Sequence, residues 1–110
     1  MDAVLDQDAA LARVGGDHEL LVEIAELFLE EYPGLLTTLA AAISNHDAYT
    51  VERTAHSLKG SIANFGAEAV RQVAFALEQT GRAGDLSGAA RLLRELESGL
   101  TALHVELESL

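Results

Sequence analysis

His56 stands in a setting that favours nucleophilic chemistry at the protein surface. The apolar residues around it recur four and three positions apart, as on one face of a helix: Val51, Ala55, Leu58, Ile62 and Phe65. At roughly 100° per residue, His56 lies about 140° from the middle of that stripe, so its imidazole is predicted to point away from the core. A neutral imidazole is a good nucleophile near pH 7 and suits phosphoryl transfer.

The neighbours of His56 on the same helix add a binding surface and a cation. Gly60 lies one turn onward and Ala63 two turns onward on the same outer face, with Lys59 on the flank. A glycine inside a helix costs about 1 kcal/mol relative to alanine, and an exposed one gains nothing by packing within its own domain. It leaves a bare patch that a second protein could approach. Lys59 could hold a phosphoryl group as a point charge on a flexible stem.

A family resemblance is carried by the segment Ala55-His56-Ser57-Leu58-Lys59-Gly60-Ser61, followed by Asn64-Phe65-Gly66-Ala67. It resembles the signature of the histidine-containing phosphotransfer (HPt) domain, a family that carries phosphoryl groups in bacterial phosphorelays. Leu11 to Asp17, Leu77-Glu78 and Gly84-Asp85 also fall where the family has similar residues. The resemblance therefore covers nearly the whole chain and implies a bundle with a four-helix core.

The resemblance implies a role for each residue of the motif. His56 would accept a phosphoryl group from an aspartyl phosphate on a receiver domain and pass it to another receiver, normally through the nitrogen farther from the backbone. Lys59 would steady the phosphoryl oxygens. The docking surface for the receiver is expected to comprise Ser57, Gly60, Ala63 and Asn64. Such domains have no kinase activity and bind no cofactor, because the receiver supplies the acidic pocket and the Mg²⁺.

Glu78 marks a departure, since some relatives have glutamine at this position. A carboxylate disfavours a phosphate nearby, so no phosphoryl contact is assigned to Glu78. Gln79 is adjacent but lies about 100° around the helix, which makes it a weak substitute.

Two other functions remain open at this point. One is a non-catalytic helical adaptor that binds partners through a degenerate histidine motif. The other is the phosphoacceptor domain of a chemotaxis-type histidine kinase. Replacing His56 by glutamine would abolish a relay and leave adaptor binding unchanged.

Metal sites and hydrolase chemistry are poorly supported. No two histidines share the i, i+4 spacing that suits a zinc site on a helix. His18 is expected on the surface of a first turn, His46 in a loop and His104 at a solvated position of the last helix. No Gly-x-Ser-x-Gly elbow accompanies the serines beside His56. The phenylalanines Phe28, Phe65 and Phe75 are expected in or near the core, and the place of Phe65 close to the site would allow partial exposure at the rim.

An Ala- and Leu-rich composition with a single proline favours helices throughout. Asp17 can cap one helix, whose Leu20, Ile24, Leu27 and Phe28 share a face, and Tyr32-Pro33 is predicted to break it. Asp47 can cap the histidine helix, placed at about 47–65, and Gly66 can close it in a left-handed conformation. A later helix is predicted to end at Gly81, before a long last one whose leucines alternate three and four apart.

These segments predict an all-α fold. We expect an antiparallel up-and-down four-helix bundle with an additional short N-terminal helix across one end, in a single domain over residues 1–110.

The charge of the chain bears on its partners. Net charge is -11, so nucleic acid and anionic membranes are poor partners. Residues 53–94, which include His56, hold six basic and three acidic residues and are the only net-positive region, suited to the acidic pocket of a partner. The longest uncharged stretch has 15 residues, whereas a membrane helix needs about 20. Together with the lack of cysteine and of a signal-like start, this predicts a cytoplasmic protein, and we expect a monomer.

Overall fold

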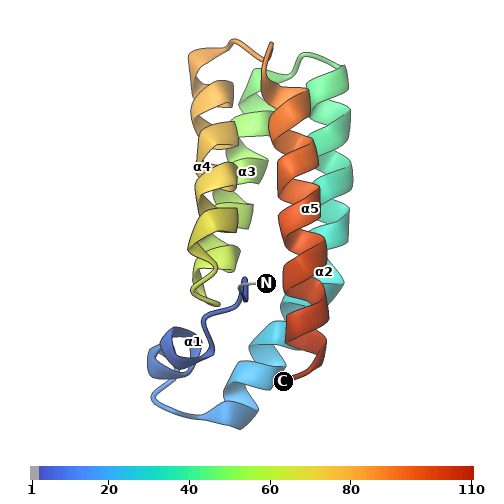
Figure 1. Ribbon diagram of the computed structural model, residues 1–110. Coiled ribbons are helices and arrows are strands. Elements are labelled where there is room, and N and C mark those ends of the chain that lie inside the picture. The colour runs from blue at the N-terminus through green and yellow to red at the C-terminus, as the bar shows by residue number, and fades with distance from the viewer. Residues whose placement is uncertain (1–2) are drawn as a thin grey trace.

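One short helix and four long ones make up the computed structural model, which describes residues 3–110. They are α1 (Gln7–Arg13), α2 (His18–Ser44), α3 (Ala48–Ala63), α4 (Glu68–Ala83) and α5 (Ala89–Glu108). Helices α2 to α5 run alternately up and down side by side, and α1 lies at the lower end of the bundle (Figure 1). The predicted all-helical bundle with a short N-terminal helix is confirmed.

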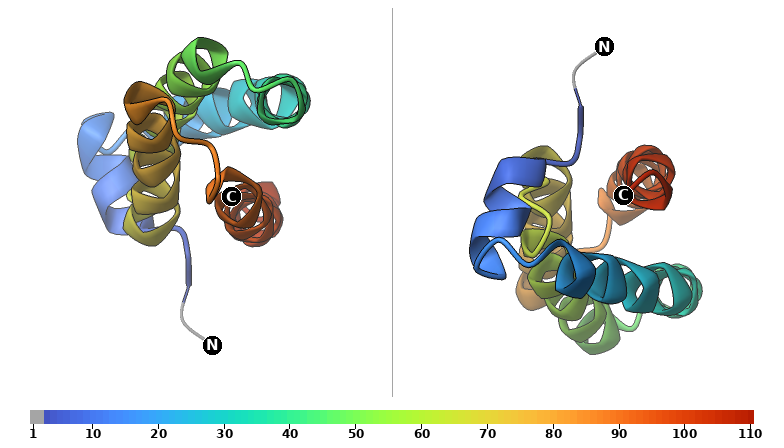
Figure 2. Two further views of the ribbon diagram at one scale, coloured as in Figure 1. Left: turned by 90° about the horizontal axis from the view of Figure 1, so that it is seen from above. Right: turned by 90° about the horizontal axis from the view of Figure 1, so that it is seen from below.

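The four long helices follow one another around the bundle axis in chain order (Figure 2). Helix α3 therefore contacts α2 on one side and α4 on the other, while α5 closes the ring between α4 and α2. All four long helices contribute to the core between them, α5 through its leucines and α3 through its apolar stripe. One side of α3 faces this core, which leaves its other side to carry the site.

The aromatic residues divide between the core and the surface. Phe65 is fully buried, with its ring centroid 5.2 Å from that of Phe28, which stacks on Tyr32 at 5.1 Å. Phe75 is 42% exposed, so its predicted place in or near the core is wrong. Phe75 lies on the outer side of α4, whereas Ala74 and Leu77 lie on the side that faces the core.

The ends of α3 are fixed by local hydrogen bonds. The Asp47 carboxylate accepts a hydrogen bond from the backbone N–H of Thr50 at 3.1 Å and so caps the helix as predicted. At the other end Gly66 has a φ of +61°, a left-handed conformation that glycine adopts without a steric penalty. A Cβ at Gly66 would lie 2.8 Å from that of Asp6, so the N-terminal segment also needs a glycine here.

Helix α2 continues through the predicted break at Tyr32-Pro33. Pro33 costs the helix a backbone hydrogen bond, and an interior proline is unfavourable by about 3 kcal/mol or more. Yet Phe28 and Tyr32 before it and Leu39 and Ala42 after it are all buried, and packing of both halves outweighs this local cost. The first half of α2 is inclined to the second in Figure 1, the bend expected of a proline inside a helix.

The predicted end of a helix at Gly81 is also wrong. Helix α4 continues to Ala83 and ends at Gly84, which has a φ of +76°. Gly81 instead lies where α4 approaches α3 most closely, because a Cβ there would meet the backbone nitrogen of Glu52 at 2.5 Å. This glycine brings the two helices of the site together.

Candidate functional site

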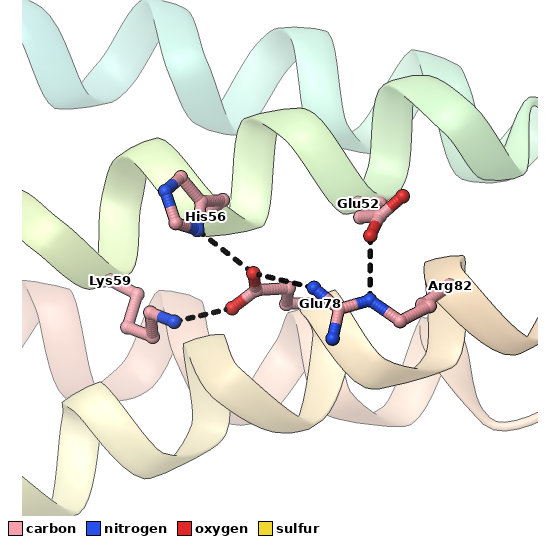
Figure 3. A network of polar contacts seen from close by, with 5 residues as sticks. All are labelled: Glu52, His56, Lys59, Glu78 and Arg82. Carbon is pink, nitrogen blue, oxygen red and sulfur yellow. Dashed lines mark hydrogen bonds and ion pairs between the residues drawn. The ribbon is translucent and has the colours of Figure 1, made fainter.

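His56 lies on α3 with its side chain 55% exposed, turned away from the core as the spacing predicts. Its Nδ1 atom is 2.8 Å from Oε2 of Glu78, which belongs to α4 (Figure 3). An ionised carboxylate only accepts hydrogen bonds, so Nδ1 carries the proton and donates it. In the neutral ring this leaves the lone pair on Nε2, the nitrogen that points away from Glu78 in Figure 3.

Glu78 is an acidic residue in the buried face of α4, with an exposed fraction of only 3%. Burial acts to raise the pKa of its carboxyl, but Lys59 and His56 together outweigh burial, and the pKa lies below its ordinary value. The carboxylate therefore stays ionised at neutral pH and holds the imidazole in one tautomer.

Lys59 reaches the same carboxylate from the flank of α3. Its Nζ lies 2.7 Å from Oε1 of Glu78 and 5.1 Å from the centre of the Phe75 ring. Among the described residues, no other cation pairs with that buried oxygen. The pairing is a short ionic contact, and Phe75 supports it through a cation–π contact.

Arg82 forms the other side of the cluster. Its Nε donates to Oε2 of Glu52 on α3 at 2.8 Å, and its Nη2 lies 3.4 Å from Oε2 of Glu78 (Figure 3). Glu52 raises the pKa of the guanidinium above its ordinary value, and Glu78 adds to this effect. Glu78 is therefore surrounded by the imidazole, the ammonium and the guanidinium.

The sequence analysis did not predict the contact of Glu78 with His56, and it assigned Glu78 no contact with a phosphoryl group. A signal was present in the sequence. Glu78 falls in the buried stripe of α4 beside Ala74, Leu77 and Gly81, and an acidic residue in such a stripe needs a cationic or hydrogen-bonding partner. Gln79 is exposed and takes no part in the cluster.

The predicted docking residues lie together on the outer side of α3. Ser57 and Gly60 are exposed, and Ala63 and Asn64 are half-buried. A Cβ at Gly60 would meet no atom within 4 Å, so this glycine serves no packing contact within the chain.

The surface continues from α3 onto α2. A cavity of about 170 Å³ lies between the two helices, lined by Ile24, Leu27, Phe28, Glu31, Ser61, Asn64 and Phe65. Leu27 is 57% exposed and Leu20 is 40% exposed, although their spacing had placed them on the buried face of α2. The apolar face of α2 is therefore wider than the part of that face that the other helices cover.

The remaining histidines lie away from this site. His18 is exposed at the start of α2 and His46 is exposed in the loop after it, as expected. His104 differs from the expectation of a solvated residue, because its Nδ1 pairs with the hydroxyl of the buried Tyr32. Within residues 3–110 no group of three or more potential ligands could hold a metal ion.

Comparison with known proteins places the chain in a family. A model of the Hpt domain matches residues 23–106, and the chain therefore belongs to the Hpt domain family. It is a histidine phosphotransfer protein, a carrier of the kind that works in phosphorelays with receiver domains. Within residues 3–110, no helix is long and apolar enough to cross a membrane.

Two solved structures share the fold. Histidine-containing phosphotransfer protein B (HptB) from Pseudomonas aeruginosa PAO1 matches with a TM-score of 0.90 and 24% identity, covering 99% of this chain and 95% of that one. The HPT domain of a sensor hybrid histidine kinase from Shewanella matches with a TM-score of 0.84 and 19% identity, covering 96% and 92%. No curated protein sequence matches the chain at a significant level.

Proposed function

We propose that His56 is the phosphoacceptor of this chain and reacts through Nε2. The observation that carries this proposal is the 2.8 Å contact between Nδ1 and the buried Glu78 carboxylate, beside an exposed ring. The Nε2 lone pair forms a bond to phosphorus of a receiver aspartyl phosphate while the bond from phosphorus to the aspartate oxygen breaks. The aspartate leaves with that electron pair as a carboxylate, and the proton stays on Nδ1.

Lys59 is proposed to balance the charge of the phosphoryl oxygens. Its side chain is long and flexible and lies one turn from His56 on α3, so its ammonium can turn toward a group on Nε2. In this proposal the chain binds no nucleotide and no metal ion. The receiver is to supply Mg²⁺ and the acidic pocket, and the chain is to act as a carrier without kinase activity.

The proposed partner surface is the outer side of α3 with the adjoining stripe of α2. Ser57, Gly60, Ala63 and Asn64 lie around His56, and Leu27 offers an exposed apolar contact beside the cavity between the helices. A receiver docked there would bring its aspartate to Nε2. We further propose that the carrier acts as a monomer in the cytoplasm, where receiver domains operate.

Transfer of a labelled phosphoryl group tests the proposal. The chain is incubated with a panel of phosphorylated receiver domains, and the His56→Gln variant is treated in parallel. We expect acid-labile, base-stable label on the wild-type chain and none on the variant. Equal label on both proteins would overturn the assignment of His56. Binding of a complete set of cognate receivers without transfer would instead support the adaptor function. If no receiver labels the chain but a kinase domain with ATP, incubated in parallel, does, the chain would be the phosphoacceptor domain of a chemotaxis-type kinase.

A further inference from the structure

Lys59 faces a conflict between two anionic groups. In the unphosphorylated protein its Nζ lies 2.7 Å from Oε1 of Glu78, in a place where that carboxylate is almost wholly buried. Its proposed role requires the ammonium to turn toward the phosphoryl group on His56. Oε1 of Glu78 would then lose the cation that pairs with it, and a buried polar atom without a partner is unfavourable.

Arg82 is placed to resolve this conflict. It lies one turn after Glu78 on α4, and its Nη2 is already 3.4 Å from Oε2, a long contact that a small movement would shorten. Its side chain is 58% exposed, so the guanidinium has room to move. Its Nε is meanwhile held by Glu52 at 2.8 Å, and the fork of the guanidinium has further N–H groups for a second carboxylate.

We propose that Arg82 is a positioning residue that becomes the main counter-ion of Glu78 when Lys59 turns to the phosphoryl group. This inference rests on the proposed function of His56. The position of Arg82 one turn after Glu78 places the guanidinium beside the carboxylate in the resting protein, and Arg82 keeps Glu78 ionised in the phosphorylated one.

The exchange of cations bears on the reversibility of transfer. With Glu78 ionised throughout, the Nδ1 proton stays in place as the Nε2–phosphorus bond forms and as it breaks. In onward transfer an aspartate oxygen of the next receiver bonds to phosphorus, and the electron pair of the broken bond returns to Nε2. Without Arg82, Lys59 stays paired with Glu78 and the phosphoryl group lacks its cation.

Chemical phosphorylation by phosphoramidate tests this inference without any receiver, because ammonia leaves as the phosphoryl group passes to Nε2. Arg82→Gln is compared with Arg71→Gln, which removes the same charge and an ion pair with Glu68 from the same helix. We expect Arg82→Gln to slow phosphorylation of His56 by about threefold to tenfold, the lower range of coupling between neighbouring residues, and Arg71→Gln to leave the rate unchanged.

Two further variants separate a counter-ion from a structural link between helices. Glu52→Gln also breaks the bridge from α3 to α4 but leaves Arg82 free to pair with Glu78, so its rate should not fall. In a Lys59→Gln background the additional Arg82→Gln change should have little effect, because no ammonium remains to be released. Equal slowing by Glu52→Gln and Arg82→Gln, or full additivity with Lys59→Gln, would overturn the inference.

The outcomes also distinguish this inference from the function on which it rests. If His56→Gln accepts as much phosphoryl group from phosphoramidate as the wild-type chain, both are overturned. If the wild-type chain is labelled on His56 and the Arg82 and Arg71 variants react equally fast, only the role of Arg82 is overturned.

Discussion

The Glu78 carboxylate fixes which nitrogen of His56 carries the proton in the neutral ring. A glutamine at this position could present either its oxygen or its NH₂ group to Nδ1, and its hydrogen bond would lack the charge that roughly doubles the strength of such a contact. Glu78→Gln should therefore give a mixture of imidazole tautomers and slower phosphorylation by phosphoramidate. Nitrogen-15 spectra of the ring should show only the Nδ1–H tautomer in the neutral wild-type chain.

The exposed neighbour of Glu78 supplies the control for this experiment. Gln79→Ala changes an adjacent side chain outside the cluster and should leave both the spectra and the rate unchanged. A wild-type chain whose neutral ring already populated both tautomers would contradict the assigned role of Glu78.

Gly60 should show opposite effects on stability and on transfer. Because a Cβ there meets nothing within 4 Å, Gly60→Ala should stabilise the helix by about 0.5–1 kcal/mol in urea unfolding. The bulkier Gly60→Gln should slow transfer from a receiver but not phosphorylation by phosphoramidate, since only docking needs the bare surface. Gly34→Ala, an exposed helical glycine of α2, should stabilise the chain and leave transfer unaffected. Slowing of both reactions by Gly60→Gln would place its effect on the histidine rather than on docking.

At the scale of residues, the features that the sequence could predict are those whose physical cause lies within a single helix. The outward direction of His56 follows from spacing within one helix, and the structure agrees with it. The contact with Glu78 depends on how closely α3 and α4 approach, which the spacing within either helix does not contain. The exposure of Leu27 likewise depends on how much of the surface of α2 is covered by α3, which the spacing within α2 does not contain.

At the scale of elements, Pro33 shows packing overriding a local preference. The predicted break was reasonable from proline chemistry alone, but buried residues on both sides keep α2 continuous. Pro33→Ala should restore a helical hydrogen bond and raise the free energy of unfolding by about 1–2 kcal/mol, after allowing for the greater freedom of the unfolded chain. Chemical denaturation followed by circular dichroism measures this change. A loss of stability would show instead that the bend itself is needed to pack α2.

Gly81 sets the distance between the two helices that carry the site. An added Cβ would lie 2.5 Å from the backbone nitrogen of Glu52 and 2.8 Å from the carbonyl oxygen of Ala48, and neither backbone atom can turn aside. Gly81→Ala should force α3 and α4 apart, cost about 1–3 kcal/mol of stability and lengthen the contact between His56 and Glu78. Urea unfolding and the ring nitrogen spectra test the two effects.

The matched change for this experiment is Gly34→Ala, since the same methyl group enters open space there. It should raise stability where Gly81→Ala lowers it. Equal stability of the Gly81→Ala chain and the wild type would mean that α3 and α4 adjust to the extra atom without strain.

At the scale of the whole molecule, charge acts on stability in two opposing ways. The chain carries a net charge of -11 at pH 7 and has a pI of about 4.5, so acidification toward that value relieves repulsion among its carboxylates. Several of those carboxylates are nevertheless stabilised by folding. The Thr50 hydroxyl and then its backbone N–H lower the pKa of Asp47, and the backbone N–H and hydroxyl of Ser87 lower that of Asp85. Glu78 has a lowered pKa as well.

The sign of the pH dependence follows from these directions. A carboxyl whose pKa is lower in the folded state than in the unfolded state adds stability above its unfolded pKa, near 4, and loses it as the pH falls through its folded pKa. The free energy of unfolding should therefore rise slightly from pH 7 to about pH 5, where repulsion declines, and fall steeply below about pH 4. Urea titrations across this range measure the curve.

High salt separates the two effects of charge. At about 1 M salt, which screens exposed charges beyond about 3 Å, the rise in stability toward pH 5 should flatten. The fall in stability in acid should persist, because the buried pairing of Glu78 is screened far less. Stability that held constant down to pH 3 would show that these carboxylates gain nothing from their partners.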